Sequence, residues 1–153
     1  MNRLQVQLGF GLILLAFLGA FVIPQLANPR LGLAAHTAGI MGGIVVIAVG
    51  ALAGSFTLAP RSRAVMEWSW VYAAYGNWAA CLLAGITGAS RLTPIAGAGT
   101  SAGAPAEALV SGMLASVGAA SVIGGVLAVW GMRPLVAAAA APSTSQSGGI
   151  ALE

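Results

Sequence analysis

His36 is the residue whose type and surroundings most directly suggest chemistry in this sequence. It is the only histidine among 153 residues, and the apolar sequence around it predicts a place near the start of a helix. Four glycines follow it by three, seven, fourteen and eighteen residues, which puts them on the same helical face: Gly39, Gly43, Gly50 and Gly54. Two interpretations are open. This smooth face can pack closely against another helix, or a flat macrocycle can lie along it with His36 as the axial iron ligand.

A second group of residues with chemical potential lies within one apolar stretch: Tyr72, Tyr75, Asn77 and Trp78. An asparagine amide at membrane depth needs a hydrogen-bond partner, and a phenol can donate a proton or a hydrogen bond to a substrate oxygen. The alternative is structural, with Asn77 bonding a neighbouring helix and the tyrosines packing. Polar groups inside a bilayer are costly, so each of them is a candidate for function.

The composition indicates which environment positions these residues. Apolar residues make up 59% of the chain and charged residues 6%, whereas soluble domains carry roughly 25% charged residues. A surface this poor in charge needs lipid as its solvent. The net charge of +3 does not indicate nucleic-acid binding, because the arginines form no cluster beyond Arg61 and Arg63. The sequence has no phosphate-binding loop or nucleophile elbow, and His36 with Cys81 gives too few ligands for zinc.

Four segments are long and apolar enough to span a bilayer as helices, which takes about 20 residues each. They run roughly over residues 4–23, 33–58, 68–88 and 108–131. The sequence thus predicts an all-α membrane protein, a four-transmembrane-helix bundle over residues 1–134, followed by a disordered C-terminal tail over residues 135–153. A signal peptide is the weaker interpretation of the first segment, because its apolar run continues past the only cleavage-like site and ends at Pro24.

Charged residues between the segments predict how the chain sits in the membrane. With four spans, the arginines divide unequally between the two sides: Arg3, Arg61, Arg63 and Arg133 against Arg30 and Arg91. The positive-inside rule then places the first side, and with it both termini, in the cytoplasm. A Gly- and Pro-rich loop over residues 89–106 precedes the fourth helix, and Pro105 and Glu107 suit the first turn of that helix.

Four stretches of the chain resemble hydroxylaminobenzene mutases. They are ANPRLGLAAH at residues 27–36, YGNW at 75–78, LTPIAG at 92–97 and EALV at 107–110. The resemblance covers nearly everything outside the tail, and its first and third stretches are the most distinctive. It implies a multi-pass isomerase of the bacterial inner membrane that acts in nitroarene degradation. Such an enzyme converts hydroxylaminobenzene to 2-aminophenol, moving the hydroxyl group from nitrogen to the ortho ring carbon without an external redox cofactor.

The chain is also similar to styrene oxide isomerase, another small membrane isomerase with four spans. That similarity lies in His36, Gly39, the run VIAV at residues 46–49 and the step Trp78-Ala79. It implies that His36 binds haem b, with Gly39 and Gly43 beside it, in a homotrimer that holds the haem between subunits. The iron would stay ferric and act as a Lewis acid. In that family an asparagine stands six residues after the histidine, where this chain has Gly42.

These resemblances lead to a hypothesis for the site. His36 is expected to hold the haem iron, while Tyr72 or Tyr75 and Asn77, as catalytic residues, orient the oxygen or the amine. Trp78 is expected to line the substrate pocket. The substrate, a small aromatic hydroxylamine, can partition in from the lipid bilayer. Two alternatives stay open: an epoxide isomerase of the styrene oxide type, and a non-enzymatic membrane scaffold or subunit.

Overall fold

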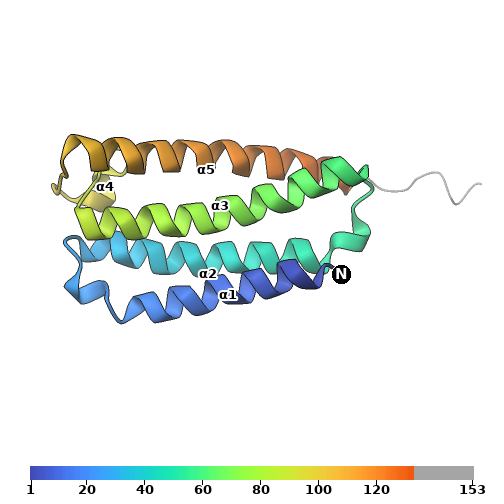
Figure 1. Cartoon of the computed structure of the whole chain (residues 1–153), viewed down its shortest axis with the longest axis horizontal. Helices are drawn as coiled ribbons and strands as arrows, with labels where there is room; N and C mark the ends of the chain where they lie inside the picture. The colour runs from blue at the N-terminus through green and yellow to red at the C-terminus, as the bar shows by residue number, and fades with distance from the viewer. Residues whose placement is uncertain (133–153) are drawn as a thin grey trace, which may run out of the picture.

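The computed structural model describes residues 1–132 of the chain, and in this range it consists of helices and the turns that join them (Figure 1). Four long helices run side by side, each antiparallel to the one before it: α1 (Arg3–Ala20), α2 (Pro29–Ala51), α3 (Pro60–Thr87) and α5 (Ala104–Gly131). The predicted all-α architecture is therefore confirmed. The predicted tail over residues 135–153, and Arg133 with it, lie outside the described residues.

Capping groups place the start of α2 earlier than residue 33, where the sequence predicted it. Asn28 precedes the helix, and its Oδ1 accepts hydrogen bonds from the N–H groups of Arg30 and Leu31 at 3.0 and 3.2 Å. Asparagine is a preferred cap because its oxygen satisfies amides that the first turn leaves without partners. Pro29 fits the next position because it has no N–H to satisfy.

The end of α2 also differs from the prediction, which extended the helix to residue 58. The helix ends at Ala51, and the chain continues through η2 (Ala53–Ser55) into an extended residue, Phe56. The N–H and hydroxyl of Thr57 then donate to the carbonyl of Gly131 at 2.9 and 3.0 Å. The sequence had suggested that Gly54 lies on the same helical face as His36. The structure places Gly54 outside α2, so it does not belong to that face.

Prolines and a glycine lie at or near the other helix boundaries. α1 ends at Ala20, and Pro24 lies in the short 3-10 helix η1 (Ile23–Gln25) rather than directly after α1. α3 begins at Pro60, well before the predicted residue 68, and ends where Gly88 adopts the left-handed conformation with φ 78°. Glycine is the usual residue at this position because it has no Cβ to clash.

Glu107 organises the loop between α3 and α5. It lies in the first turn of α5, as predicted, and its carboxylate accepts hydrogen bonds from three backbone N–H groups of the loop: Ser90 at 3.1 Å, Arg91 at 2.9 Å and Ala102 at 3.1 Å. A carboxylate near a helix N-terminus is favourable because the exposed amides carry partial positive charge. The loop also contains a single-turn helix, α4 (Pro94–Gly97), which the sequence prediction left out.

Asn28 ties the same loop to the start of α2. Its side chain is buried, and its Nδ2 donates to the carbonyl of Gly97 at 2.9 Å and to the Oγ1 of Thr100 at 2.8 Å. The backbone N–H of Asn28 donates to the carbonyl of Gly85 at 2.9 Å. One asparagine thus joins α2, α3 and the long loop at one end of the molecule.

The four long helices form a row rather than a closed bundle. Each packs against its neighbour in the sequence, in the order α1, α2, α3 and α5, while α1 and α5 do not pack against each other (Figure 1). One cluster of buried apolar side chains lies between the first three helices: Leu12, Val46, Val71 and Ala74. Further clusters lie near the two ends of the helices, built around Leu31 and Met66.

Large apolar side chains cover the outside of this row. Phe21 and Val129, for example, are both 79% exposed, which is typical of a surface solvated by lipid. Among the described helices, α1, α2 and α5 are long and apolar enough to cross a membrane. α3 is long enough but less apolar than these three helices, because its sequence includes charged and polar residues such as Arg63, Glu67 and Asn77.

Candidate functional site

His36 lies near the start of α2, at the outer edge of the contact with α1. Its Nδ1 is 2.8 Å from the carbonyl oxygen of Ala16, and its ring stands edge-on to Phe17 at a centroid distance of 5.6 Å. A carbonyl oxygen only accepts hydrogen bonds, so Nδ1 donates its proton in this contact, and Nε2 takes no part in it. The same arrangement orients many histidines that bind metals. His36 is thus prepared to act as a ligand through Nε2.

The glycines that follow His36 lie in the contact between α1 and α2. A Cβ atom on Gly39 would come 2.6 Å from the Cβ of Ala16 and 2.8 Å from Cδ1 of Trp78. A Cβ atom on Gly43 would come 2.6 Å from the carbonyl oxygen of Gly9. Such distances exclude any larger residue unless the helices move apart, so the glycines allow close helix packing. Within one chain α1 occupies this face, and contact of Gly39 and Gly43 with a cofactor stays a prediction.

The polar groups and the indole of the four predicted residues of α3 contact different neighbours. The hydroxyl of Tyr75 donates to a backbone carbonyl of α1 at 2.9 Å. The hydroxyl of Tyr72 lies 2.8 Å from Oγ of Ser116 on α5, and Trp78 packs against the Gly39 face of α2. Neighbouring residues of a helix project about 100° apart, which is why proximity in sequence does not bring these side chains together.

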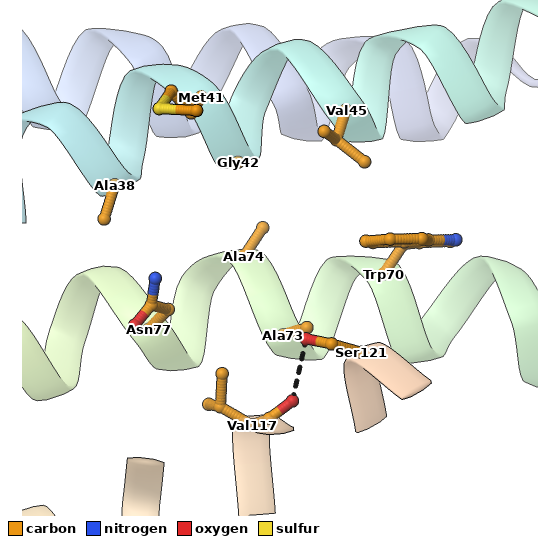
Figure 2. A pocket seen from close by; sticks show the side chains of 10 residues that line it. All are labelled: Ala38, Met41, Gly42, Val45, Trp70, Ala73, Ala74, Asn77, Val117 and Ser121. Carbon is orange, nitrogen blue, oxygen red and sulfur yellow. Dashed lines mark hydrogen bonds between the residues drawn. The ribbon is translucent and has the colours of Figure 1, made fainter. Parts of the chain in front are cut away.

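Asn77 lines a pocket that α2, α3 and α5 enclose (Figure 2). The pocket has a volume of about 240 Å³, and most of its walls are apolar. Its lining includes residues from all three helices: Ala38, Gly42 and Val45 of α2, Trp70 and Asn77 of α3, and Ser121 of α5. Of the predicted site residues, Asn77 is the one that this pocket contains.

The Nδ2 group of Asn77 is a free hydrogen-bond donor in the pocket. The Oδ1 of Asn77 accepts from the Sγ of Cys81 at 3.8 Å, and the described residues give its Nδ2 no partner. Ser121 donates its hydroxyl proton to the carbonyl of the preceding turn at 2.9 Å. The Nε1 of Trp70 also has no partner, but it lies against Gly124, where an added Cβ would be 3.1 Å away. In Figure 2 the Asn77 amide nitrogen points toward α2.

His36 and this pocket lie on different sides of α2. Val45 in the pocket wall is nine residues after His36, which is about two and a half helical turns and so the opposite side of the helix. His36 contacts α1, whereas the pocket is enclosed by α2, α3 and α5. One chain therefore does not assemble the predicted site in which His36 and Asn77 act on the same molecule.

The analysis of the sequence missed the other residues that line this pocket. Ala38, Val45 and Trp70, among them, had no assigned role in a site. A signal was available, because Ala38, Met41, Gly42 and Val45 recur at spacings of three, four and seven residues. That spacing defines one helical face. It is the face opposite the glycines, which drew attention because they accompany the histidine.

Comparisons with known proteins cover nearly the whole of the described chain. The family model described as styrene oxide isomerase matches residues 1–133. The chain is 38% identical over 132 residues to hydroxylaminobenzene mutase HabB of Ectopseudomonas oleovorans, which covers 86% of this chain and 80% of that protein. It is 34% identical over 89 residues to hydroxylaminobenzene mutase HabA of the same organism, covering 58% and 66% of the two chains. No solved structure matches.

Proposed function

Because the chain belongs to the styrene oxide isomerase family, and is an isomerase, we propose that it converts hydroxylaminobenzene, or a close aromatic relative, to the corresponding 2-aminophenol. The observation that carries this proposal is the 38% identity over 132 residues to a hydroxylaminobenzene mutase. The family resemblance predicted from the sequence is confirmed. The alternative of a non-enzymatic scaffold has no support in these similarities.

The proposed reaction rearranges one molecule and leaves its composition unchanged. The N–O bond of the hydroxylamine breaks, and a C–O bond forms at the ortho carbon. The ortho hydrogen leaves as a proton, and the nitrogen takes up a proton to become the amine. No external oxidant or reductant is needed, so the site has to stabilise separated charge and keep water away from an electron-poor ring.

His36 fits the proposed haem b. The described residues include no group of three His, Cys, Asp or Glu side chains that could hold a metal ion, but a haem needs only an axial protein ligand. The carbonyl of Ala16 fixes the proton of His36 on Nδ1 and leaves Nε2 to bind. When bound, ferric haem would supply a Lewis acid for the charge that develops on the departing oxygen.

Asn77 is proposed to orient the substrate. Its free Nδ2 group can donate a hydrogen bond to the oxygen or nitrogen of the hydroxylamine, and the apolar pocket beside it excludes bulk water. Water that reached the ring would give the para product. Tyr72, which is 51% exposed on the outside of α3, is the tyrosine best placed to meet a molecule outside its own chain. In one chain Tyr75 and Trp78 serve packing.

The positions of His36 and Asn77 support a homo-oligomer. The two residues face different sides of α2, so a single substrate can meet both only where two copies of the chain come together. The open row of helices leaves wide apolar surfaces for such contacts. We propose a trimer, as the similarity to styrene oxide isomerase implies.

We also propose that α3 crosses the membrane with the other three long helices. It lies between α2 and α5 along their length (Figure 1). Its polar groups are directed largely to neighbouring helices: Tyr75 bonds α1, Tyr72 contacts α5 and Asn77 lines the pocket. Four crossings put both chain termini on the same side of the membrane as the loop around residue 61, and the arginines of that loop favour the cytoplasm of a bacterial cell.

The name of the matching family model favours a second candidate, the isomerisation of an epoxide such as styrene oxide. Both reactions move charge within one small aromatic molecule that carries a labile oxygen. The two differ in product. Hydroxylaminobenzene would give 2-aminophenol, and styrene oxide would give phenylacetaldehyde.

The test uses the purified full chain in mild detergent, after growth with a haem supply. We expect 2-aminophenol from hydroxylaminobenzene, together with an intense Soret absorption band. His36→Ala should lose both, and Thr37→Val, a change at the exposed neighbour, should keep both. Phenylacetaldehyde from styrene oxide without 2-aminophenol would establish the second candidate instead. Activity without a Soret band would contradict the haem and leave the isomerase.

Asn77→Ala tests the role of the pocket amide in the same assay. Loss of the hydrogen bond to the substrate should lower kcat/KM by about tenfold or more, or raise the share of para product, because hydrogen bonds in such sites are worth about 1–3 kcal/mol. A fully active and ortho-selective Asn77→Ala enzyme would show that the amide does not orient the substrate.

A further inference from the structure

The pocket between α2, α3 and α5 opens sideways to the outer surface of the molecule. A groove along the outside of α2 and α3 shares Ala38, Met41 and Asn77 with the pocket. The same groove extends past Leu33 to Arg30 at the start of α2. Met41 and Leu33 are 62% and 57% exposed, so the groove faces the lipid around the proposed spans. Asn77 therefore stands where pocket and groove meet.

The size of the pocket suits one aromatic ring. Its volume is about 240 Å³, and an apolar cavity of about 150 Å³ is known to bind benzene. In Figure 2, Asn77 lies toward one end and the indole of Trp70 toward the other. They are seven residues apart on α3, which corresponds to about 10 Å along the helix. This space holds a ring with a small substituent.

The chemistry of the walls narrows the ligand further. Trp70, Val45 and several alanines give apolar walls, and Ser121 uses its hydroxyl proton within its own helix. The amide Nδ2 of Asn77 is left as a donor at the mouth. A ligand that satisfies this arrangement is apolar at one end and carries a hydrogen-bond acceptor at the other.

We propose that this pocket holds the ring of a single-ring aromatic compound, with its polar substituent at Asn77 and its ring between Val45 and Trp70. Ala38 and Val45 then determine how large a ring is admitted. The identity of the substituent, a hydroxylamine, rests on the proposed function. Binding of the ring itself does not, because it is argued from the volume, the apolar walls and the amide donor at the mouth.

The probe for this site is nitrobenzene, which quenches indole fluorescence. It has nitro oxygens that can accept from Asn77 and no N–OH bond to rearrange. We expect the full chain in detergent to show a saturable quenching component above the linear collisional background. Trp70→Phe should remove that component, because Trp70 lines the pocket. Saturable quenching that survives Trp70→Phe unchanged, or its absence in the unmodified chain, would overturn the proposal.

Two variants in the pocket and one control test which residues set the ring size. Ala38→Leu, at the mouth, should weaken nitrobenzene binding roughly tenfold, a loss that corresponds to a misfit of about 1.4 kcal/mol. Ala48→Leu introduces the same side chain at an exposed position of α2 outside the pocket and should leave binding unchanged. Equal affinities for the two variants would contradict the proposal.

Val45→Ala keeps the test decisive should Ala38→Leu fail to fold. The enlarged pocket should shift the relative affinity for 1-nitronaphthalene over nitrobenzene by roughly tenfold, and an unchanged ratio would refute the assigned site. The outcome is separable from that of the proposed function. If the chain converts hydroxylaminobenzene but shows no saturable quenching, the proposed function stands and the proposed ring site is wrong. If the chain binds nitrobenzene but makes no 2-aminophenol, the ring site stands and the proposed function is wrong.

Discussion

The helices α2 and α5 carry similar series of glycines and use them differently. In α2, an added Cβ at Gly39, Gly43 or Gly50 would collide with α1 or with Trp78. In α5, an added Cβ at Gly112, Gly118 or Gly125 would meet nothing within 4 Å. The difference follows from position in the row, because α2 lies between two helices and α5 at one edge. The buried share of the apolar span is accordingly 33% in α2 and 11% in α5.

This comparison shows what a glycine pattern can and cannot indicate. Small residues at helical spacing identify a face that permits close approach, but they do not say whether the approaching partner belongs to the same chain. In α2 the partner is α1. In α5 the open face is left to lipid or to another copy of the chain.

The largest effect should come from filling the tightest contact of α2. Gly43→Ala places a methyl group 2.6 Å from the carbonyl oxygen of Gly9, so α1 must move away, and we expect a loss of about 1–3 kcal/mol of stability. Gly118→Ala, on the open face of α5, should change stability little. Thermal unfolding in detergent, followed by circular dichroism, measures both. Equal destabilisation would mean that another chain covers Gly118, and size-exclusion chromatography of the two variants would then differ in oligomer size.

The next largest loss of stability should come from the polar residues at the start of the same two helices, the cap Asn28 of α2 and Glu107 in the first turn of α5. Asn28→Ala removes the cap of α2 and the hydrogen bonds to Gly97 and Thr100, and we expect it to cost about 1–2 kcal/mol. Glu107→Gln at the start of α5 keeps an oxygen acceptor for the loop amides and should unfold closer to the original temperature. If Glu107→Gln is the more damaging change, the charge of Glu107 rather than its acceptor capacity holds α5 in place.

The smallest effect should separate the two tyrosines of α3. Tyr75→Phe loses a half-buried hydrogen bond to α1, worth about 1 kcal/mol. Tyr72→Phe loses a contact with Ser116 at an exposed position and should cost less. The same proteins should be assayed with hydroxylaminobenzene. A large drop in kcat for Tyr72→Phe, in a protein whose unfolding temperature is nearly unchanged, would assign a catalytic role to that phenol.

Much of the fold could be predicted from the sequence, because long apolar runs in so small a chain have few ways to be solvated. The helix ends could not be placed as well. Their positions depend on particular capping contacts, such as Asn28 before Pro29 and Gly88 after Thr87. The short α4 depends on contacts with distant residues, since Asn28 bonds the carbonyl of Gly97 at its end.

The candidate site was only partly predictable for a similar reason. His36 and Asn77 stood out as isolated polar groups in apolar surroundings, and each does occupy a distinct environment. Their relation could not be read from the sequence, because the direction of each side chain is set by helix rotation and by the order of packing. The pocket residues Ala38 and Val45 carry no chemical signal of their own and acquire a role only through the helices opposite them.

The row of helices also bears on how the protein is made. Since each helix packs on the one that precedes it in the chain, a segment leaving the ribosome finds its partner already in the membrane, and few contacts must wait for distant sequence. The hydrogen bonds from Asn28 to the loop and from Thr57 to Gly131 are exceptions, for they join early and late segments at opposite ends of the molecule. Biogenesis would therefore proceed helix by helix and finish with these two polar closures. Chains arrested after α2 should already show the α1–α2 pair when tested by cysteine crosslinking between the two helices.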